Sequence, residues 1–116
     1  MSSNWFHIER GRGRPLILLH GIGMSNAAWA PLIDLLAAER RVIAFDIAGF
    51  GRSPPLAQGL APNMTNLAAA LSANLSGLGI VAPVDLVGNS LGGQLALTAA
   101  CKGLARSVVA LSPGGL

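Results

Sequence analysis

The chain alternates between short apolar runs and longer segments in which apolar residues recur every three or four positions. Leu16–Leu19 is continuously apolar and bounded by Pro15 and Gly21, which is typical of a strand buried on both faces. Three later runs have the same apolar character: Arg41–Phe45, Val84–Val87 and Ser107–Leu111. The pattern therefore predicts four strands of a parallel sheet.

Between these runs the apolar period changes to that of a helix. The first such segment places four apolar residues on one face: Trp29, Leu32, Ile33 and Leu36. Ser25 or Asn26 is predicted to cap it. The second has its stripe at Leu67, Leu71, Leu75 and Leu78. Its predicted cap is Asn63 or Thr65, and Gly77 and Gly79 end it. The third predicted helix is Leu91–Cys101, followed by Lys102 and Gly103.

A further strand is predicted at Trp5–Ile8, where apolar and polar residues alternate, followed by a turn at Arg10–Arg14. The tight turn would allow this first strand to run antiparallel. Strands that alternate with helices form βαβ units, so the expected fold is α/β, a mostly parallel sheet with helices on both faces. Residues 1–116 are expected to form a single domain, because this length supports one core and not two.

The composition of the chain indicates which classes of binding partner and which cellular location to expect. The chain is 52% hydrophobic and 11% charged. It has neither an apolar run of the roughly 18 residues needed to span a membrane nor an apolar leader at its start. We therefore expect a cytoplasmic protein without a membrane partner. The net charge is +3, and Arg10, Arg12 and Arg14 lack interleaved aromatic residues. We interpret them as a solvated turn and expect no nucleic-acid partner.

Cys101 is the only cysteine, so neither an intrachain disulfide nor a cysteine-rich metal site can form. Its alanine-rich surroundings predict a small buried thiol. We expect no bound metal.

The chemistry lies in Gly88-Asn89-Ser90-Leu91-Gly92, which matches G-x-S-x-G between a predicted strand and a predicted helix. In this setting the chain turns abruptly and exposes the hydroxyl of Ser90, the predicted nucleophile. Side chains at Gly88 and Gly92 would collide with the neighbouring strand and helix, and Gly93 relaxes the same crowding. The non-catalytic alternative is that Ser90 is an ordinary helix N-cap between two flexible glycines.

A second loop, His20-Gly21-Ile22-Gly23, follows the strand Leu16–Leu19 and opens at the same edge of the sheet. Backbone N–H groups here and at Leu91 can form an oxyanion hole. Ile22 is our first choice for the second donor and Gly23 the alternative. His20 is predicted to be structural, with its ring bonded to nearby backbone, rather than a catalytic base.

The segment Asp46–Ser53 follows the next strand. We interpret it as a turn in which Asp46 and Ser53 bond backbone while glycines supply positive φ. An alternative interpretation joins Gly21-x-Gly23 and Asp46 into a dinucleotide-binding turn. Asn26 stands where that fingerprint needs its third glycine, and the elbow at Ser90 stays unexplained, so this interpretation is disfavoured.

Taken together, these residues resemble the α/β-hydrolase superfamily, in the branch of small-molecule esterases, peroxidase-like enzymes and C–C-bond hydrolases. The resemblance rests on His20-Gly21, Trp29, Asp46-x-x-Gly49-x-Gly51-x-Ser53, Gly88-Asn89-Ser90-Leu91-Gly92-Gly93 and Leu111-Ser112-Pro113. It spans nearly the whole chain and is specific for the fold rather than for the substrate.

The resemblance implies a Ser–acid–His triad in that chain order, an acyl-enzyme and no organic cofactor. Only the nucleophile position, Ser90, is matched. We therefore expect the chain to be the N-terminal portion of a hydrolase acting on a small-molecule carbonyl, above all a carboxylic ester. Because the triad acid and histidine are expected to lie outside these 116 residues, we expect the isolated chain to be inactive or nearly so. The alternatives to a hydrolase are a catalytically inactive fragment and the disfavoured dinucleotide-binding module. The strand Ser107–Leu111 would be an exposed sheet edge that allows self-association.

Overall fold

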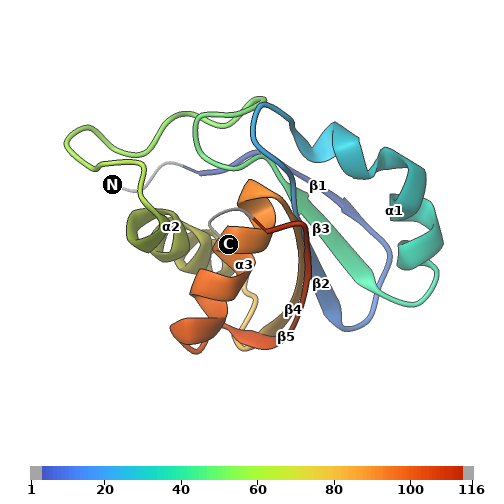
Figure 1. The fold of residues 1–116 in the computed structure, drawn as a ribbon. Coiled ribbons are helices and arrows are strands. Elements are labelled where there is room, and N and C mark those ends of the chain that lie inside the picture. The colour runs from blue at the N-terminus through green and yellow to red at the C-terminus, as the bar shows by residue number, and fades with distance from the viewer. Residues whose placement is uncertain (1–3, 114–116) are drawn as a thin grey trace.

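A computed structural model describes residues 4–113 as a five-stranded sheet with helices on both faces (Figure 1). The strands are β1 (His7–Arg10), β2 (Pro15–Leu19), β3 (Arg41–Phe45), β4 (Val84–Asn89) and β5 (Ala105–Leu111). Their order across the sheet is β1-β3-β2-β4-β5, and all neighbours are parallel except β1 and β3. The predicted α/β class is confirmed.

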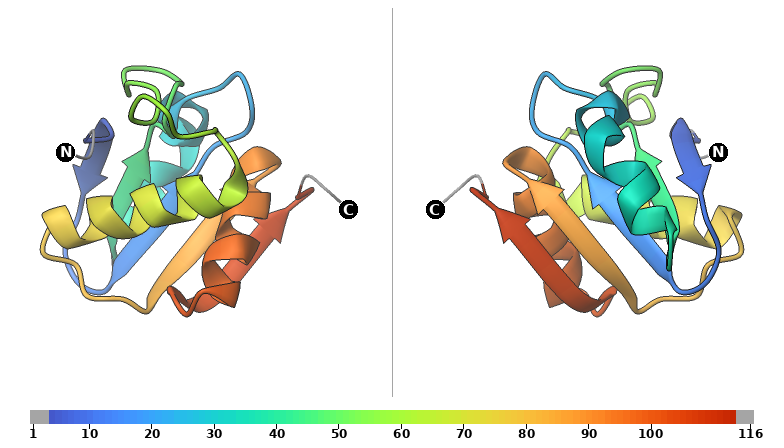
Figure 2. Two further views of the ribbon diagram at one scale, coloured as in Figure 1. Left: turned by 90° about the vertical axis from the view of Figure 1, so that its left-hand side faces the viewer. Right: turned by 90° about the vertical axis from the view of Figure 1, so that its right-hand side faces the viewer.

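The helical elements are a 3₁₀ turn, η1 (Asn26–Trp29), and three helices, α1 (Ala30–Ala37), α2 (Met64–Gly77) and α3 (Leu91–Cys101). Figure 2 shows α2 and α3 against one face of the sheet and α1 against the other. Ser25 caps η1 by accepting from the Ala27 N–H at 3.3 Å. Asn63, rather than Thr65, caps α2 by accepting from the Asn66 N–H at 2.8 Å.

The first strand differs from its prediction in position, because it begins at His7 rather than Trp5. It runs antiparallel, as the tight turn would allow, and its partner is β3. Trp5 instead lies in the core, and its backbone N–H donates to Asn74 Oδ1 on α2 at 2.8 Å. The alternation of Trp5–Ile8 therefore reflected one core residue followed by an edge strand.

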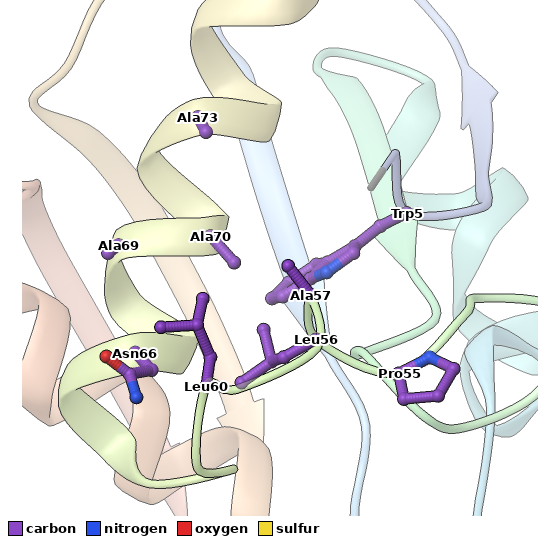
Figure 3. A pocket seen from close by; sticks show the side chains of 9 residues that line it. All are labelled: Trp5, Pro55, Leu56, Ala57, Leu60, Asn66, Ala69, Ala70 and Ala73. Atoms are coloured by element: carbon purple, nitrogen blue, oxygen red, sulfur yellow. The ribbon is translucent and has the colours of Figure 1, made fainter. Parts of the chain in front are cut away.

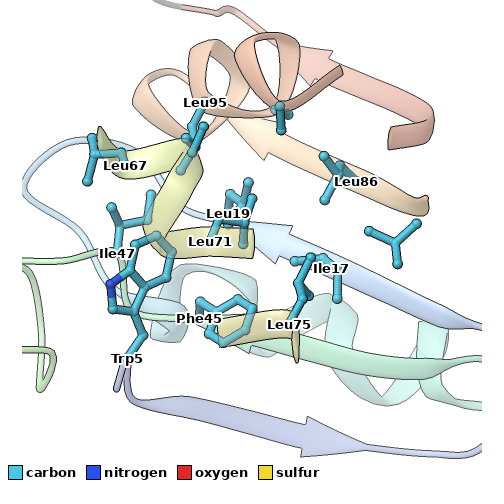
Figure 4. Close-up of a cluster of buried hydrophobic side chains, with 14 of the residues drawn as sticks. Trp5, Ile17, Leu19, Phe45, Ile47, Leu67, Leu71, Leu75, Leu86 and Leu95 are labelled. Carbon is cyan, nitrogen blue, oxygen red and sulfur yellow. The ribbon is translucent and has the colours of Figure 1, made fainter. Parts of the chain in front are cut away.

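Alternate residues of the inner strands supply two cores, one on each side of the sheet. Ile17 and Leu19 face the larger core, which α2 and α3 cover (Figure 4). Leu16 and Leu18 face the smaller one, which Trp29 and α1 cover. This double burial explains why the central strands are continuously apolar.

The face of β4 and β5 on the α1 side carries no helix among residues 4–113 (Figure 2, right). Val108 packs against the larger core, so Val109 and Leu111 point to the opposite, uncovered face. They are 52% and 46% exposed. Within the described residues β5 pairs only with β4, which confirms that it is an edge strand.

At the amino ends of β4 and β5, the buried Asp85 binds two arginines. Arg106 donates to its carboxylate at 3.0 and 3.1 Å, and Arg40 donates at 2.6 Å. The hydroxyl of Ser107 adds a bond of 2.7 Å. Chiefly because of the Arg106 guanidinium, the pKa of Asp85 lies well below its usual range. This cluster joins β4, β5 and the loop between α1 and β3 at the end of the sheet opposite Ser90.

The prediction of a buried thiol was wrong, because Cys101 is exposed at the end of α3. The buried stripe of α3 runs through Leu95, Ala96 and Ala99. A residue two positions beyond Ala99 falls on the outer face at 100° per residue. In the part of the chain that is described, no helix is long and apolar enough to cross a membrane.

Candidate active site

Ser90 stands at the sharp turn between β4 and α3. Its backbone angles, φ 54° and ψ −114°, lie in a sparsely populated region for a residue with a side chain. Bonds on both sides hold the turn: Ser90 N–H donates to Leu111 O at 2.9 Å, and Gln94 N–H donates to Ser90 O at 3.0 Å. The Ser90 hydroxyl makes no capping bond to α3. An ordinary N-cap serine accepts a hydrogen bond from the first turn of its helix with its hydroxyl oxygen, so this geometry favours the nucleophile elbow.

The glycines around Ser90 are required by close backbone packing. A Cβ at Gly88 would lie within 3.0 Å of the backbone of Gly92 and Gly93. A Cβ at Gly92 would overlap the carbonyls of Leu19 and His20. Strand β4, the start of α3 and the end of β2 thus meet at van der Waals distance, as the sequence predicted.

The loop after β2 lies directly beside the nucleophile. Gly92 N–H donates to His20 O at 3.0 Å, and a Cβ at Gly21 would be 3.4 Å from that of Ser90. Gly23 has φ 72°, and Ile22 is 70% exposed. The two segments that carry the predicted oxyanion donors are therefore adjacent, whereas the donor roles of Ile22, Gly23 and Leu91 stay predictions.

His20 is fully buried, and both its ring nitrogens are engaged with backbone. Nε2 accepts from the Ile47 N–H at 2.9 Å. Nδ1 must then carry the proton, and it donates to Gly21 O at 2.7 Å. Burial lowers the pKa of the His20 imidazole. The geometry agrees with the structural role expected for His20 and leaves no nitrogen free to act as a base.

Asp46 is buried, and both its carboxylate oxygens are used. Oδ1 accepts from the backbone and side-chain nitrogens of Asn26 at 2.7 and 2.9 Å. Oδ2 accepts from Arg52 N–H at 2.9 Å. Ser53 donates its hydroxyl to Asp46 O, and Gly51 has φ 53°. Asp46 therefore organises a turn, and neither oxygen is exposed to serve as a triad acid or to bind a ribose.

A cavity of about 270 Å³ opens on the α1 side of the nucleophile turn. It is lined by His20, Gly21, Met24, Ala28, Trp29, Asn89 and Leu111. Trp29 is 6% exposed, and its indole Nε1 is a buried donor with no acceptor among the described residues. Sequence patterns placed Trp29 and Leu111 only in a helix and a strand, and gave no sign that they share a cavity.

A second hollow, of about 190 Å³, lies between α2 and the loop before it (Figure 3). Its walls are Trp5, Pro55, Leu56, Ala57, Leu60, Asn66, Ala69, Ala70 and Ala73. None of these residues is titratable or belongs to the elbow. This hollow therefore contributes no group to the chemistry at Ser90.

No histidine among the described residues can reach Ser90 as a base. The chain has two histidines. His20 is engaged as described, and His7 lies on β1, three strands from β4. At a strand spacing of about 4.8 Å this places His7 roughly 14 Å away across the sheet.

Comparison with known proteins agrees with this geometry. Residues 14–114 match the family model described as alpha/beta hydrolase fold. The pimeloyl-[acyl-carrier protein] methyl ester esterase of Aeromonas salmonicida is 42% identical over 98 residues, which are 78% of this chain and 35% of that protein. The 2-hydroxy-6-oxo-2,4-heptadienoate hydrolase of Pseudomonas putida is 39% identical over 95 residues, 79% of this chain and 34% of that protein. The dihydrolipoyllysine-residue acetyltransferase component of an acetoin cleaving system, also from P. putida, is 40% identical over 91% of this chain and 27% of its own length.

Solved structures give the same picture. The naproxen esterase of Bacillus subtilis superposes with a TM-score of 0.86 at 29% identity, over 97% of this chain and 40% of that one. A thermophilic esterase of Thermogutta terrifontis gives 0.84 at 30% identity, over 94% and 40%. The chain thus spans less than half the length of the relatives it matches. Its sheet, its elbow and the family match show that it belongs to the alpha/beta hydrolase fold family.

Proposed function

We propose that this chain carries the nucleophile and the oxyanion donors of a serine hydrolase that acts on small-molecule carbonyl compounds, above all carboxylic esters. The observation that carries the proposal is the conformation of Ser90. The turn is strained, held on both sides by backbone bonds and packed against glycines, while the hydroxyl is spared from capping. Strain of this kind concentrates at functional sites.

In the proposed reaction, Ser90 Oγ attacks the carbonyl carbon while a histidine base takes the hydroxyl proton. The amides of Leu91 and Ile22, with Gly23 as the alternative, hold the oxyanion, and the amino end of α3 favours its charge. The base returns its proton to the leaving group, and water then releases the acyl group. No metal or organic cofactor takes part in this scheme.

The names of the relatives support the substrate class. Three of the similar proteins are called esterases: a methyl ester esterase, a naproxen esterase and a thermophilic esterase. A fourth is called a 2-hydroxy-6-oxo-2,4-heptadienoate hydrolase. A serine nucleophile suits both esters and ketones, because each presents a carbonyl to the same oxyanion hole.

The test is labelling of the full chain with a fluorophosphonate, located by peptide mass spectrometry. Because neither histidine of the described residues reaches Ser90, we expect slow labelling that is confined to Ser90 and accelerates as the pH is raised. Ser90→Ala should abolish it, whereas Ser112→Ala, at the other serine with positive φ, should not. Labelling that persists in Ser90→Ala, or no adduct on Ser90 after prolonged exposure at high pH, would contradict the proposal.

A further inference from the structure

The hollow between α2 and the loop before it lies apart from the chemistry at Ser90. It is on the α2 side of the sheet, whereas the cavity beside the nucleophile turn is on the α1 side. Its volume is about 190 Å³, and the side chains of its walls are apolar apart from Asn66 and the indole N–H of Trp5. An apolar cavity of roughly 150 Å³ is large enough to take up benzene. The hollow can therefore hold a molecule with one small ring.

The indole of Trp5 brings a hydrogen-bond donor to this hollow. Trp5 is 4% exposed, and its ring packs edge-on against Phe45 with 5.6 Å between the ring centroids. Figure 3 shows the indole pointing into the hollow, toward Leu56 and Ala70. The backbone N–H of Trp5 is bonded to Asn74 Oδ1, whereas the indole N–H has no hydrogen bond to any group of the described residues. Most nearly buried donors in folded proteins have an acceptor, so this N–H indicates where the acceptor of a ligand fits.

Hydrogen bonds hold the walls of the hollow in place. Asn66 Nδ2 donates to Ala61 O at 2.8 Å, which ties the loop to the first turn of α2. Within the loop, Leu60 N–H closes a turn by donating to Ala57 O at 3.0 Å. Sites for small molecules are usually pre-formed, concave and mostly apolar, with a few polar groups that orient the ligand. The hollow has each of these properties.

We propose that this hollow binds a small uncharged molecule with an apolar body and one hydrogen-bond acceptor, such as an aryl ketone. The apolar body packs between Leu56, Leu60 and α2, and the acceptor receives the indole N–H of Trp5. Among the described residues no charged side chain lines the hollow, so a charged ligand would lose its hydration without gaining a partner. The site is separate from Ser90, and its occupancy does not depend on the proposed function.

The experiment titrates the full chain, labelled with ¹⁵N, with acetophenone, which combines a phenyl ring with one carbonyl acceptor. The chain has two tryptophans, and Trp5→Phe and Trp29→Phe assign their indole ¹H–¹⁵N resonances. We expect the Trp5 resonance to shift and to saturate, with a dissociation constant on the order of 1 mM or lower. A Trp5 resonance that stays in place, or that shifts no more than that of Trp29, would overturn the site.

Two further probes test the chemistry assigned to the ligand. α-Methylstyrene has the shape of acetophenone with a methylene group in place of the carbonyl oxygen, so it can fill the hollow without accepting the indole N–H. The indole proton of Trp5 should therefore move further downfield with acetophenone than with α-methylstyrene. Benzoate has the same ring and a full charge, and it should bind roughly tenfold more weakly or worse. Equal proton shifts with the two uncharged probes, or benzoate binding as tight as that of acetophenone, would contradict this chemistry.

A variant with a filled hollow tests the location of the site. Ala70→Leu places three more carbon atoms in the wall that faces Trp5, and it should lower the affinity for acetophenone roughly tenfold or more, because the space for the ring is lost. Ala100→Leu makes the same change at an exposed alanine of α3 outside the hollow and should keep the wild-type affinity. Circular dichroism verifies that both variants fold.

A second variant tests the same wall at an exposed position, where folding is not at stake. Leu60 is 51% exposed, and Leu60→Asp puts a carboxylate at the hollow that should abolish binding of acetophenone. Leu35→Asp, at a residue 73% exposed on α1, is the matched control and should leave binding unchanged. Acetophenone binding that survives Leu60→Asp, or that survives Ala70→Leu in a folded chain, would overturn the site. Equal losses in the variants and their controls would do the same.

Discussion

Two glycines decide whether the nucleophile turn can form at all. Gly88 and Gly92 have backbone, not flexible side chains, where a methyl group would stand. The backbone of β2, β4 and α3 cannot move away from a methyl group without displacing the sheet. Two residues without reactive side chains therefore fix the position of Ser90.

Gly88→Ala is expected to lower the free energy of unfolding by about 3 kcal/mol or more, because overpacking against backbone adds to the usual cost of a core insertion. Urea unfolding followed by circular dichroism measures it. The matched control is Gly77→Ala at the end of α2, where nothing lies within 4 Å and φ is ordinary. It should leave stability unchanged or slightly raised. Equal stability of the two variants would contradict the crowding at the elbow.

His20 makes stability depend on pH in a defined direction. Its pKa is lowered in the fold, because burial disfavours the imidazolium and Ile47 N–H needs Nε2 unprotonated. The unfolded chain then binds more protons than the folded one below the ordinary value of 6.5. Stability should therefore fall as the pH drops from about 6.5 towards 5.

Thermal unfolding at a series of pH values measures this effect in the wild type and in His20→Gln. His20→Gln should be less stable at pH 7, and its stability should depend less on pH between 5 and 6.5. A variant whose stability keeps the wild-type dependence on pH would contradict this role of His20.

At the scale of elements, the predicted and observed bounds agree closely for strands that are buried on both faces and for helices that bury one stripe of apolar residues. Arg41–Phe45 and Leu91–Cys101 have the bounds that the pattern predicts. The first strand did not, because pairing of β1 with β3 depends on a contact 32 or more residues away. The hydrogen bond from the backbone N–H of Trp5 to Asn74 joins residues 69 positions apart, and no local pattern encodes it.

The same limit applies to the candidate site. Ser90, its glycines and the His20 loop were predictable, since a local strand–turn–helix context specifies them. The cavity was not, because Trp29 and Leu111 meet only after β2, β4 and η1 are assembled. The exposure of Cys101 was not predicted, because an alanine-rich composition does not specify which face of the helix a residue occupies.

The Asp85 cluster connects β4 and β5 to the loop between α1 and β3, so its loss should destabilise all three. Asp85→Asn is expected to lower the free energy of unfolding by roughly 1–3 kcal/mol, since two arginines lose their charge-assisted bonds. In the wild type the pKa of Asp85 is depressed, so its stabilising contribution is present above 3.8 and lost as the pH falls below it. Chemical unfolding at pH 7 and pH 3 checks both statements. A variant as acid-sensitive as the wild type would place the acid response elsewhere.

At the scale of the whole molecule, we propose that β5, which pairs only with β4 within residues 4–113, permits the chain to associate with itself. Exposed edge strands with apolar faces are templates for pairing. Light scattering at rising concentration should show oligomers that are lost in Val109→Lys. They should persist in the control Val81→Lys, because Val81 is an 86% exposed residue in the loop between α2 and β4. A monomer at all concentrations would show that β5 is protected by other means.

Tryptophan emission can separate the two halves of this fold. Trp5 belongs to the core beneath α2 and α3, and Trp29 to the core beneath α1. The chain contains no tyrosine, so replacing either indole by phenylalanine leaves a single fluorophore that reports on one side of the sheet. Coincident denaturation curves from the two variants would mean that both layers melt as one cooperative unit. An earlier transition at Trp29 would mean that the layer beside the nucleophile opens first, while the other layer stays folded behind it.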